Sequence, residues 1–206
     1  MASASSLDFI SATRIPNERE LYGTFVKALL NSELRSELGY VATEFQVGRD
    51  ETKGRVDFFF NYRKTSFLLE LKVARIGLGA DADSHAEDEE ANPKIRITKP
   101  WVDGVVSQLQ QLEIDTLSAC LHQKIVKLPM VIYLYVDWRK NGPREGREEA
   151  ALSVHQNIIK DLAAAPPEFE YFTVFNTPIR TRKRRSTLDD EPNMSLYGFS
   201  FIAGTV

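Results

Sequence analysis

Two strand-like segments separated by a three-residue turn constrain the fold of this chain more than any other feature. Residues 56–62 and 66–75 are rich in aromatic and branched apolar side chains, and the turn at 63–65 is polar. Segments joined by so short a turn are expected to pair as an antiparallel hairpin. If the first two turn residues form its tip, counting outward along both strands places Asp57 opposite Glu70, with side chains about 5 Å apart on one face.

Strand alternation adds a third charged side chain to this face. Lys72 lies two residues beyond Glu70 and therefore shares the face of both carboxylates. Leu69, Leu71 and Val73 alternate with them and are expected to point into the core. The turn lacks an Asn-Gly pair, yet a slip of two residues would preserve this alternation. The sequence therefore predicts two carboxylates and a lysine on one face of a sheet.

The remaining hydrophobic pattern predicts helices and strands on both sides of this hairpin. Apolar residues recur at helical spacing from Asn17, the expected N-cap, to about residue 37, and Gly39 is expected to end that helix. We expect further strands at 40–47, 128–138, 171–175 and 196–202, and further helices at 102–117 and 148–164. This order predicts an α/β fold with a mixed central β-sheet flanked by helices.

The composition excludes several classes of protein. The chain has 206 residues, about the length of one domain, and we expect residues 1–206 to form a single domain with a loose tail at 1–13. The single cysteine, Cys120, excludes a disulfide framework and a multi-cysteine zinc site. The longest apolar run, residues 130–136, is too short to span a bilayer, and we expect no secretory signal in the first residues, which have no basic residue and no apolar stretch. We expect a cytoplasmic protein, or a nuclear one in a eukaryote, without a membrane partner.

The small net charge of −3 hides two oppositely charged segments. Six acidic residues and no lysine or arginine lie between positions 81 and 90, and we expect residues 77–93 to form a flexible acidic loop. We expect a basic, polar loop at 178–194, which either contacts nucleic-acid phosphates or is simply solvated. Its candidate nucleic-acid-binding residues are Arg180, Arg182, Lys183, Arg184 and Arg185.

The paired carboxylates and the lysine suit metal-assisted hydrolysis of a phosphodiester. Asp57 and Glu70 would repel one another unless a cation lay between them, and hard oxygen ligands of this kind suit Mg²⁺. We expect Mn²⁺ to substitute for it. A lysine beside the metal, here Lys72, can orient or help to deprotonate water and can offset charge on the phosphorus. The plainer interpretation is a cross-strand salt bridge on a half-exposed sheet face.

Asp57, followed after twelve residues by Glu70-Leu71-Lys72, resembles the signature of the PD-(D/E)XK nuclease superfamily. Val56 stands before the aspartate, where the family pattern has proline. The expected order of elements across residues 15–140 is similar to the order in that family. The resemblance implies a restriction-endonuclease-like αβββαβ core with C-terminal α/β additions. It also implies a Mg²⁺-dependent nuclease that acts on DNA in preference to RNA.

The resemblance further implies roles for individual residues. Asp57 and Glu70 would hold the metal together with the backbone carbonyl of Leu71. Lys72 would position or activate the attacking water. Many nucleases of this fold pair to cut two strands, so a homodimer is also open, although the sequence offers no identifiable dimer face.

A glutamine on the helix after this motif is a further candidate. Nucleases similar to RecB carry a glutamine there, and the segment Val105-Val106-Ser107-Gln108-Leu109 resembles their pattern. Gln108 is the best match, ahead of Gln111, and would orient Lys72 or a phosphate. An ordinary surface glutamine is the alternative interpretation.

The first helix is expected to bring one more carboxylate to the site. On a helical wheel Glu18 falls within the apolar stripe, whereas Glu20 falls on the opposite side. A carboxylate on a buried face needs a partner or a metal, so we expect Glu18 to support the metal through water. The alternative is that a first-turn glutamate only stabilises the helix dipole. Glu44, in the strand at 40–47, could also face the site, but strand glutamates mostly face solvent, so it is not counted among the candidates.

Two other classes of function stay open at this point. One is a catalytically inactive module with this fold that binds nucleic acid or a protein partner. The other is a protein-interaction domain whose charged loops meet partners. Metal binding separates the nuclease from both, and salt-dependent DNA binding without cleavage would favour the inactive module.

Overall fold

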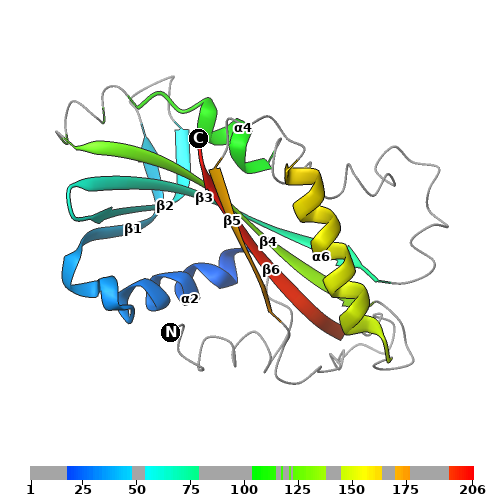
Figure 1. Cartoon of the computed structure of the whole chain (residues 1–206). Coiled ribbons are helices and arrows are strands. Elements are labelled where there is room, and N and C mark those ends of the chain that lie inside the picture. Colours follow the sequence, from blue (N-terminus) through cyan, green and yellow to red (C-terminus); the bar gives the residue numbers. More distant parts are fainter. Residues whose placement is uncertain are drawn as a thin grey trace, which may run out of the picture.

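The computed structural model describes residues 18–47, 54–78, 104–114, 117, 121, 123–137, 145–163, 170–176 and 195–206. A six-stranded sheet lies at its centre, with helices packed against it (Figure 1). The strands are β1 (Leu38–Val47), β2 (Gly54–Tyr62), β3 (Thr65–Gly77), β4 (Lys124–Asp137), β5 (Glu170–Asn176) and β6 (Ser195–Thr205). The helices are α2 (Glu18–Leu30), the 3₁₀-helix η1 (Glu33–Glu37), α4 (Ser107–Gln110) and α6 (Arg147–Ala163).

The strands follow the order β1-β2-β3-β4-β6-β5 across the sheet. β3 and β4 pair in parallel along the whole of β3. The other neighbouring strands of this sheet pair antiparallel. The described chain is therefore an α/β structure with a mixed central sheet, as the sequence predicted.

The hairpin of β2 and β3 has the register expected from the sequence. Phe58 pairs with Leu69, and the ladder continues to a turn with Arg63 and Lys64 at its tip. Arg63 has a positive φ of 53°, which suits a two-residue loop whose twist matches the flanking strands. Regular pairing ends at Phe58 and Leu69, one position short of Asp57. The two strands therefore separate where the predicted charged residues begin.

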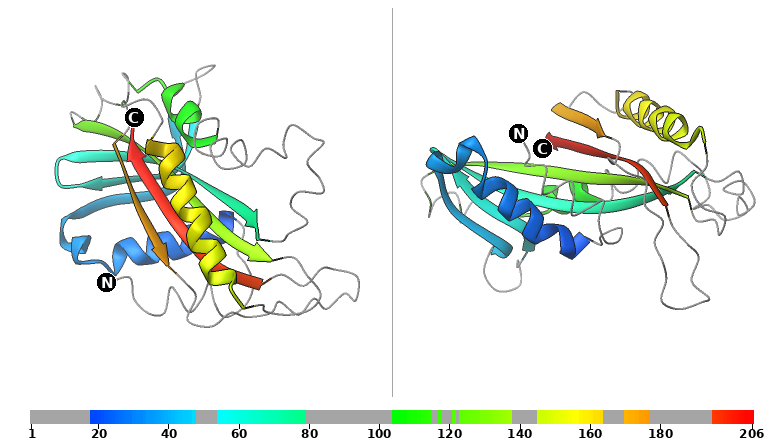
Figure 2. Two further views of the ribbon diagram at one scale, coloured as in Figure 1. Left: turned by 45° about the vertical axis from the view of Figure 1, so that its right-hand side comes forward. Right: turned by 90° about the horizontal axis from the view of Figure 1, so that it is seen from below.

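Different helices cover the two faces of the sheet (Figure 2). Leu21 of α2 packs into a cluster with Phe58 on one face. Ile158 of α6 packs with Tyr133 on the other face. Leu109 of α4 also lies on this second face, where it packs with residues of β1, β2 and β3. None of the helices in the described ranges is long and apolar enough to cross a lipid bilayer.

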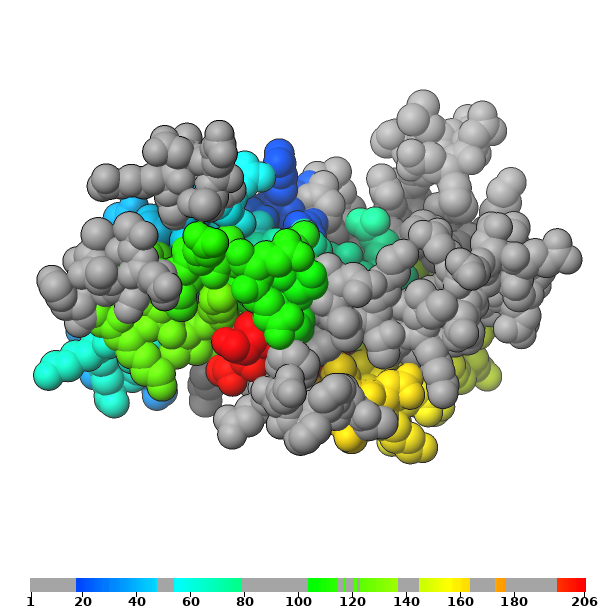
Figure 3. All heavy atoms as spheres, turned by 90° about the horizontal axis from the view of Figure 1, so that it is seen from above, coloured from blue at the N-terminus to red at the C-terminus, as the bar shows by residue number. Residues whose placement is uncertain are grey.

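The end of the chain supports α4. Val206 packs against the cluster that contains Leu109, and its N–H donates to the carbonyl of Lys127 at 3.2 Å. Figure 3 shows the C-terminal end of the chain (red) against the green segment that contains α4. The C-terminal residue therefore packs beneath the helix that carries Gln108.

The first helix is shorter than expected. The sequence predicted one helix to about residue 37, but α2 ends at Leu30 and η1 follows. Ser32 explains the break, because its hydroxyl accepts a hydrogen bond from the N–H of Leu34 at 3.2 Å and caps η1. A serine that satisfies the backbone in this way starts a new helix instead of continuing the old one.

The predicted helix at 102–117 is also wrong in length. Residues 104–106 form a wide π-type turn, α4 spans four residues, and residues 112–114 are irregular. Leu112 and Ile114 instead pack against the cluster that contains Leu109. Apolar contacts with the sheet therefore outweigh the helical pattern here.

Most of the predicted loops lie outside the described residues. This is true of the tail at 1–13 and of the basic loop at 178–194 with its five arginine and lysine residues. Of the acidic loop expected at 77–93, only the first two residues are described. Gly77 still belongs to β3, and the N–H of buried Leu78 donates to the carbonyl of Val136 at 2.8 Å. Gly77 is therefore part of the sheet, and Leu78 is hydrogen-bonded to its neighbouring strand β4.

Candidate functional site

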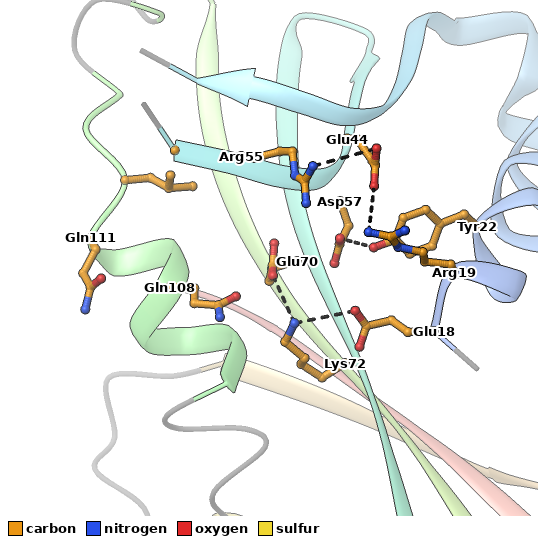
Figure 4. Close-up of a pocket in the computed structure, with 12 residues that line it drawn as sticks. Glu18, Arg19, Tyr22, Glu44, Arg55, Asp57, Glu70, Lys72, Gln108 and Gln111 are labelled. Carbon is orange, nitrogen blue, oxygen red and sulfur yellow. Dashed lines mark hydrogen bonds and ion pairs between the residues drawn. The ribbon is translucent and has the colours of Figure 1, made fainter. Parts of the chain in front are cut away.

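A pocket lies beside the point where β2 and β3 separate, between the start of α2 and α4 (Figure 4). Its volume of about 590 Å³ is within the range of sites that bind ligands. The lining comes from five elements and the segment after α4. The residues are Glu18, Arg19, Tyr22, Glu44, Gly54, Arg55, Asp57, Glu70, Lys72, Gln108, Gln111 and Leu112.

The five side chains that the sequence singled out all line this pocket. Glu18 comes from α2, Asp57 from β2, Glu70 and Lys72 from β3, and Gln108 from α4. The sequence separates the first and last of these by ninety positions, and the fold brings them to one cavity. The candidate arginines and lysine at 180–185 lie outside the described residues.

Asp57, on β2, is held in place by partners on β3 and α2. Its Oδ2 accepts a hydrogen bond from the backbone N–H of Leu71 at 2.8 Å, and its Oδ1 accepts one from the hydroxyl of Tyr22. The ring of Tyr22 packs edge-on against Phe58, with centroids 4.8 Å apart. Burial and the Asp57 carboxylate raise the pKa of Tyr22, so its hydroxyl stays a donor. The orientation of Asp57 is therefore fixed by partners on both sides.

Glu70 is a buried carboxylate. It is only 6% exposed, and burial, followed by the charge of Asp57, raises its pKa to about 7. The side chain of Gln108, with its amide oriented by the hydrogen-bond network, donates to Glu70 Oε1 at 2.5 Å and to the carbonyl of Gly104 at 3.1 Å. Gln108 therefore contacts the acid directly.

Lys72 lies between two acids from different elements. Its Nζ is 3.5 Å from Oε1 of Glu70 and 3.6 Å from Oε1 of Glu18. The charge of Lys72 lowers the pKa of Glu70 and so opposes part of the effect of burial. Figure 4 shows Lys72 and Glu18 on the same side of Asp57.

Glu44 is a pocket residue that the sequence interpretation missed. It occupies the β1 position opposite Asp57, where the β1–β2 ladder has a gap. Its φ of 50° lies in the left-handed region, which costs a non-glycine residue on the order of 1 kcal/mol. This residue also reverses the alternation of β1: Val41 packs with the α2 cluster, whereas Phe45 packs with the α4 cluster. Its side chain is 44% exposed, as expected for a strand glutamate, and it also lines the pocket.

Tyr22, Arg19 and Arg55 were missed for other reasons. Tyr22 falls within the apolar stripe of α2 and looks like an ordinary core residue in the sequence. Arg19 and Arg55 approach opposite oxygens of Glu44, each at 3.9 Å. Their contacts with Glu44 depend on the backbone conformation of Glu44, which the sequence pattern does not reveal.

The pocket residues fit a divalent cation of the Mg²⁺ type. Across the described ranges, no three His, Cys, Asp or Glu side chains are grouped as in a closed metal site. Mg²⁺ does not require such a group, because it keeps several waters and binds through one or two carboxylates. The raised pKa of Glu70 supports the fit, because burial and the charge of Asp57 disfavour the ionised form of Glu70, and a bound cation would offset that effect.

The arrangement is thus a pocket with fixed carboxylates, a lysine shared between acids, and a glutamine in contact with the buried acid. Comparisons of the chain with protein-family models, with curated proteins and with solved structures found no match.

Proposed function

We propose that this chain is a metal-dependent nuclease of the PD-(D/E)XK kind, which hydrolyses phosphodiester bonds. The observation that carries the proposal is Glu70, a buried carboxylate next to Asp57 and Lys72 in a pocket. A structural salt bridge on an exposed sheet face would not bury its acid or raise its pKa. The order α2, β1–β3, α4, β4 supports a restriction-endonuclease-like core. The preference for DNA over RNA rests on the sequence resemblance.

Asp57, Glu70 and the carbonyl of Leu71 would hold Mg²⁺ or Mn²⁺, with Glu18 acting through water. The N–H of Leu71 points toward β2, because it donates to Asp57. In an extended strand the N–H and C=O of one residue point to the same edge, so the Leu71 carbonyl also faces the gap between the strands. When bound, the metal supplies Lewis-acid stabilisation of the phosphate and acidifies water.

Lys72 is the residue placed to act on the attacking water. Its Nζ lies within 3.6 Å of Glu18 and within 3.5 Å of Glu70, so it is fixed beside both acids. From there it can orient water by hydrogen bonding and offset negative charge that develops on the phosphate. Gln108 acts as a positioning residue, because it donates to Glu70 and fixes that carboxylate.

One observation favours a second candidate, a catalytically inactive module that binds nucleic acid or protein. Asp57 and Lys72 already have partners within the protein: Asp57 accepts hydrogen bonds from Tyr22 and Leu71, and Lys72 lies beside two acids. A site that has lost its metal could keep its fold through such contacts. The two candidates differ in whether Lys72 is needed for cleavage or contributes only to stability.

Incubation with DNA and RNA substrates in Mg²⁺, Mn²⁺ or EDTA decides between them. The nuclease should cleave only with metal, and Lys72→Ala should lose about 10²- to 10⁴-fold in rate while its affinity for DNA changes little. The matched control is Lys64→Ala, which removes the same charge at the tip of the β2–β3 hairpin. Wild-type protein that cleaves nothing with either metal, with Lys72→Ala unchanged in every property, would establish the inactive module.

A further inference from the structure

Two arginines from different elements converge on one carboxylate at the edge of the pocket. Arg19 of α2 lies 3.9 Å from Oε1 of Glu44, and Arg55 of β2 lies 3.9 Å from Oε2. Figure 4 shows Arg55 and Glu44 on the side of Asp57 away from Lys72, with Arg19 beside Asp57 and joined to Glu44 by a dashed line. Glu44 has a left-handed backbone, and the β1–β2 pairing has a gap at this position.

Neither arginine is used up by its contact with Glu44. The side chains of Arg19 and Arg55 are 78% and 62% exposed, and both distances are at the outer limit of an ion pair. Arg63, at the other end of β2, contrasts with them, because it makes two hydrogen bonds to Glu37, one of them at 2.9 Å. A guanidinium has five N–H donors, so among the described residues these long single contacts leave most donors of Arg19 and Arg55 for a ligand.

The charge of the pocket indicates what that ligand is. Four carboxyl groups and three cationic side chains line it, which gives a formal net charge of −1 when every carboxyl group is ionised. An anionic substrate therefore needs cationic groups at its point of entry as well as a cation among the acids. Guanidinium groups match phosphate oxygens in a bidentate manner, and two of them held side by side suit a phosphodiester chain.

We propose that Arg19 and Arg55, aligned by Glu44, form a phosphate clamp for the nucleic-acid backbone next to the scissile bond. This inference rests on the proposed nuclease function and names how the same pocket holds its substrate. Glu44 is a positioning residue in this arrangement: it sets the spacing of the two guanidinium groups and does not touch the substrate.

The test compares Arg19→Ala, Arg55→Ala and the double variant with Arg63→Ala. Arg63→Ala is the matched control, since it removes the same charge from an exposed arginine outside the pocket. Binding of a labelled duplex and of a labelled single strand is measured in Mg²⁺, with Lys72→Ala in every protein to prevent turnover. Kinetic constants are measured with Lys72 intact, and thermal unfolding verifies that each variant folds.

Each arginine removed should weaken binding by up to about fivefold, as for an exposed ion pair. The slope of log affinity against log salt should flatten by about 0.9 per arginine on the duplex and about 0.7 on the single strand. KM should rise with kcat nearly constant, and Glu44→Gln should show a smaller rise in KM. Arg63→Ala should change the salt slope less than either pocket variant.

A double variant whose KM and salt slope equal those of Arg63→Ala overturns the clamp but leaves the nuclease in place. A loss in kcat with unchanged KM also overturns it, because the arginines would then act in the transition state. Failure of the proposed function looks different: wild-type protein would cleave nothing with Mg²⁺ or Mn²⁺. Binding could then still depend on Arg19 and Arg55, which would support the clamp in an inactive module.

Discussion

The hydroxyl of Tyr22 donates a hydrogen bond to Oδ1 of Asp57, and this contact joins α2 to β2 across thirty-five positions of sequence. The other carboxylate oxygen accepts the N–H of Leu71. Asp57 thus replaces the strand pairing that ends at Phe58 and Leu69 with contacts made by its own side chain. The separation of β2 and β3 is stabilised by the same residue that the proposed chemistry needs.

Removing the Tyr22 hydroxyl should loosen Asp57 without disturbing the core. In Tyr22→Phe the ring can still pack against Phe58, but Oδ1 of Asp57 loses its donor. We expect a higher Mg²⁺ concentration for half-saturation, measured by calorimetry, and a loss of about 1 kcal/mol in the free energy of unfolding. Tyr40→Phe is the control, because Tyr40 is 61% exposed and lies outside the pocket. Equal Mg²⁺ affinity in both variants would show that the Tyr22 hydroxyl does not position Asp57 for the metal.

Metal binding should depend on pH through Glu70. Its pKa is raised from 4.5 to about 7, so between these values the folded protein holds a proton that the unfolded chain has lost. In EDTA, the stabilisation from this group is present below pH 4.5 and is lost as the pH rises through about 7. Mg²⁺ displaces the proton, so its affinity should rise across the same window.

Calorimetry in buffers of different ionisation enthalpy measures this proton release directly. Near pH 6, binding of Mg²⁺ should release up to about one proton, and above about pH 8 close to none. Glu70→Gln should abolish both the release and most of the binding. Proton release that persists in Glu70→Gln would place the titrating group elsewhere.

Gly54→Ala should damage the site through packing. A Cβ at Gly54 would lie 1.9 Å from Cδ2 of Leu112, which follows α4 and lines the pocket. The displaced leucine should shift Gln108, and the overpacking should cost about 1–3 kcal/mol in the free energy of unfolding, measured with denaturant. Leu112→Ala in the same chain should recover part of this loss.

Gly23→Ala is the matched control for that variant. Gly23 lies in α2, and a Cβ there would meet nothing within 4 Å. The substitution should therefore stabilise the protein by about 0.5–1 kcal/mol through higher helix propensity. If both glycine variants behave alike, the contact between Gly54 and Leu112 does not limit the packing of α4.

A series of buried hydrogen bonds between α6 and the sheet should make the stability of the fold decrease at low pH. Nδ1 of His155 is 2.8 Å from Oγ of Ser200, which is 2.6 Å from the hydroxyl of Tyr135. Burial lowers the pKa of His155 below its ordinary 6.5, so the neutral form stabilises the fold above that value. As the pH falls below 6.5 toward the lowered pKa, this stability is lost.

Denaturant unfolding at about pH 8 and about pH 5 tests this dependence. His155→Gln should flatten it, and Ser200→Ala should cost about 1–3 kcal/mol at both pH values by leaving buried partners unsatisfied. Neither variant should alter the Mg²⁺ affinity of the pocket, since none of the three residues lines it. A pH dependence that is unchanged in His155→Gln would assign it to other groups.

Local features of the sequence predicted much of the site, and non-local ones accounted for what was missed. The register of β2 and β3 follows from a short turn, and the face of Lys72 follows from alternation, so both could be read from neighbouring residues. Glu44 could not, because its left-handed φ breaks the alternation on which the reading depends. The strand predicted from residue 128 begins at Lys124 in the structure. Its first four residues could not be predicted locally either, because they pair in parallel with β3.

The parallel pairing of β3 with β4 has a consequence for the synthesis of the chain. Every described pocket residue precedes β4, so the ribosome completes this part before the strand that covers the edge of β3 exists. Until then β3 exposes one edge of a thirteen-residue strand with buried apolar side chains on both faces. Such an edge is a template for pairing with another chain. The partly synthesised protein is therefore the species most prone to aggregate, and fragments that end before Lys124 should be recovered in insoluble form.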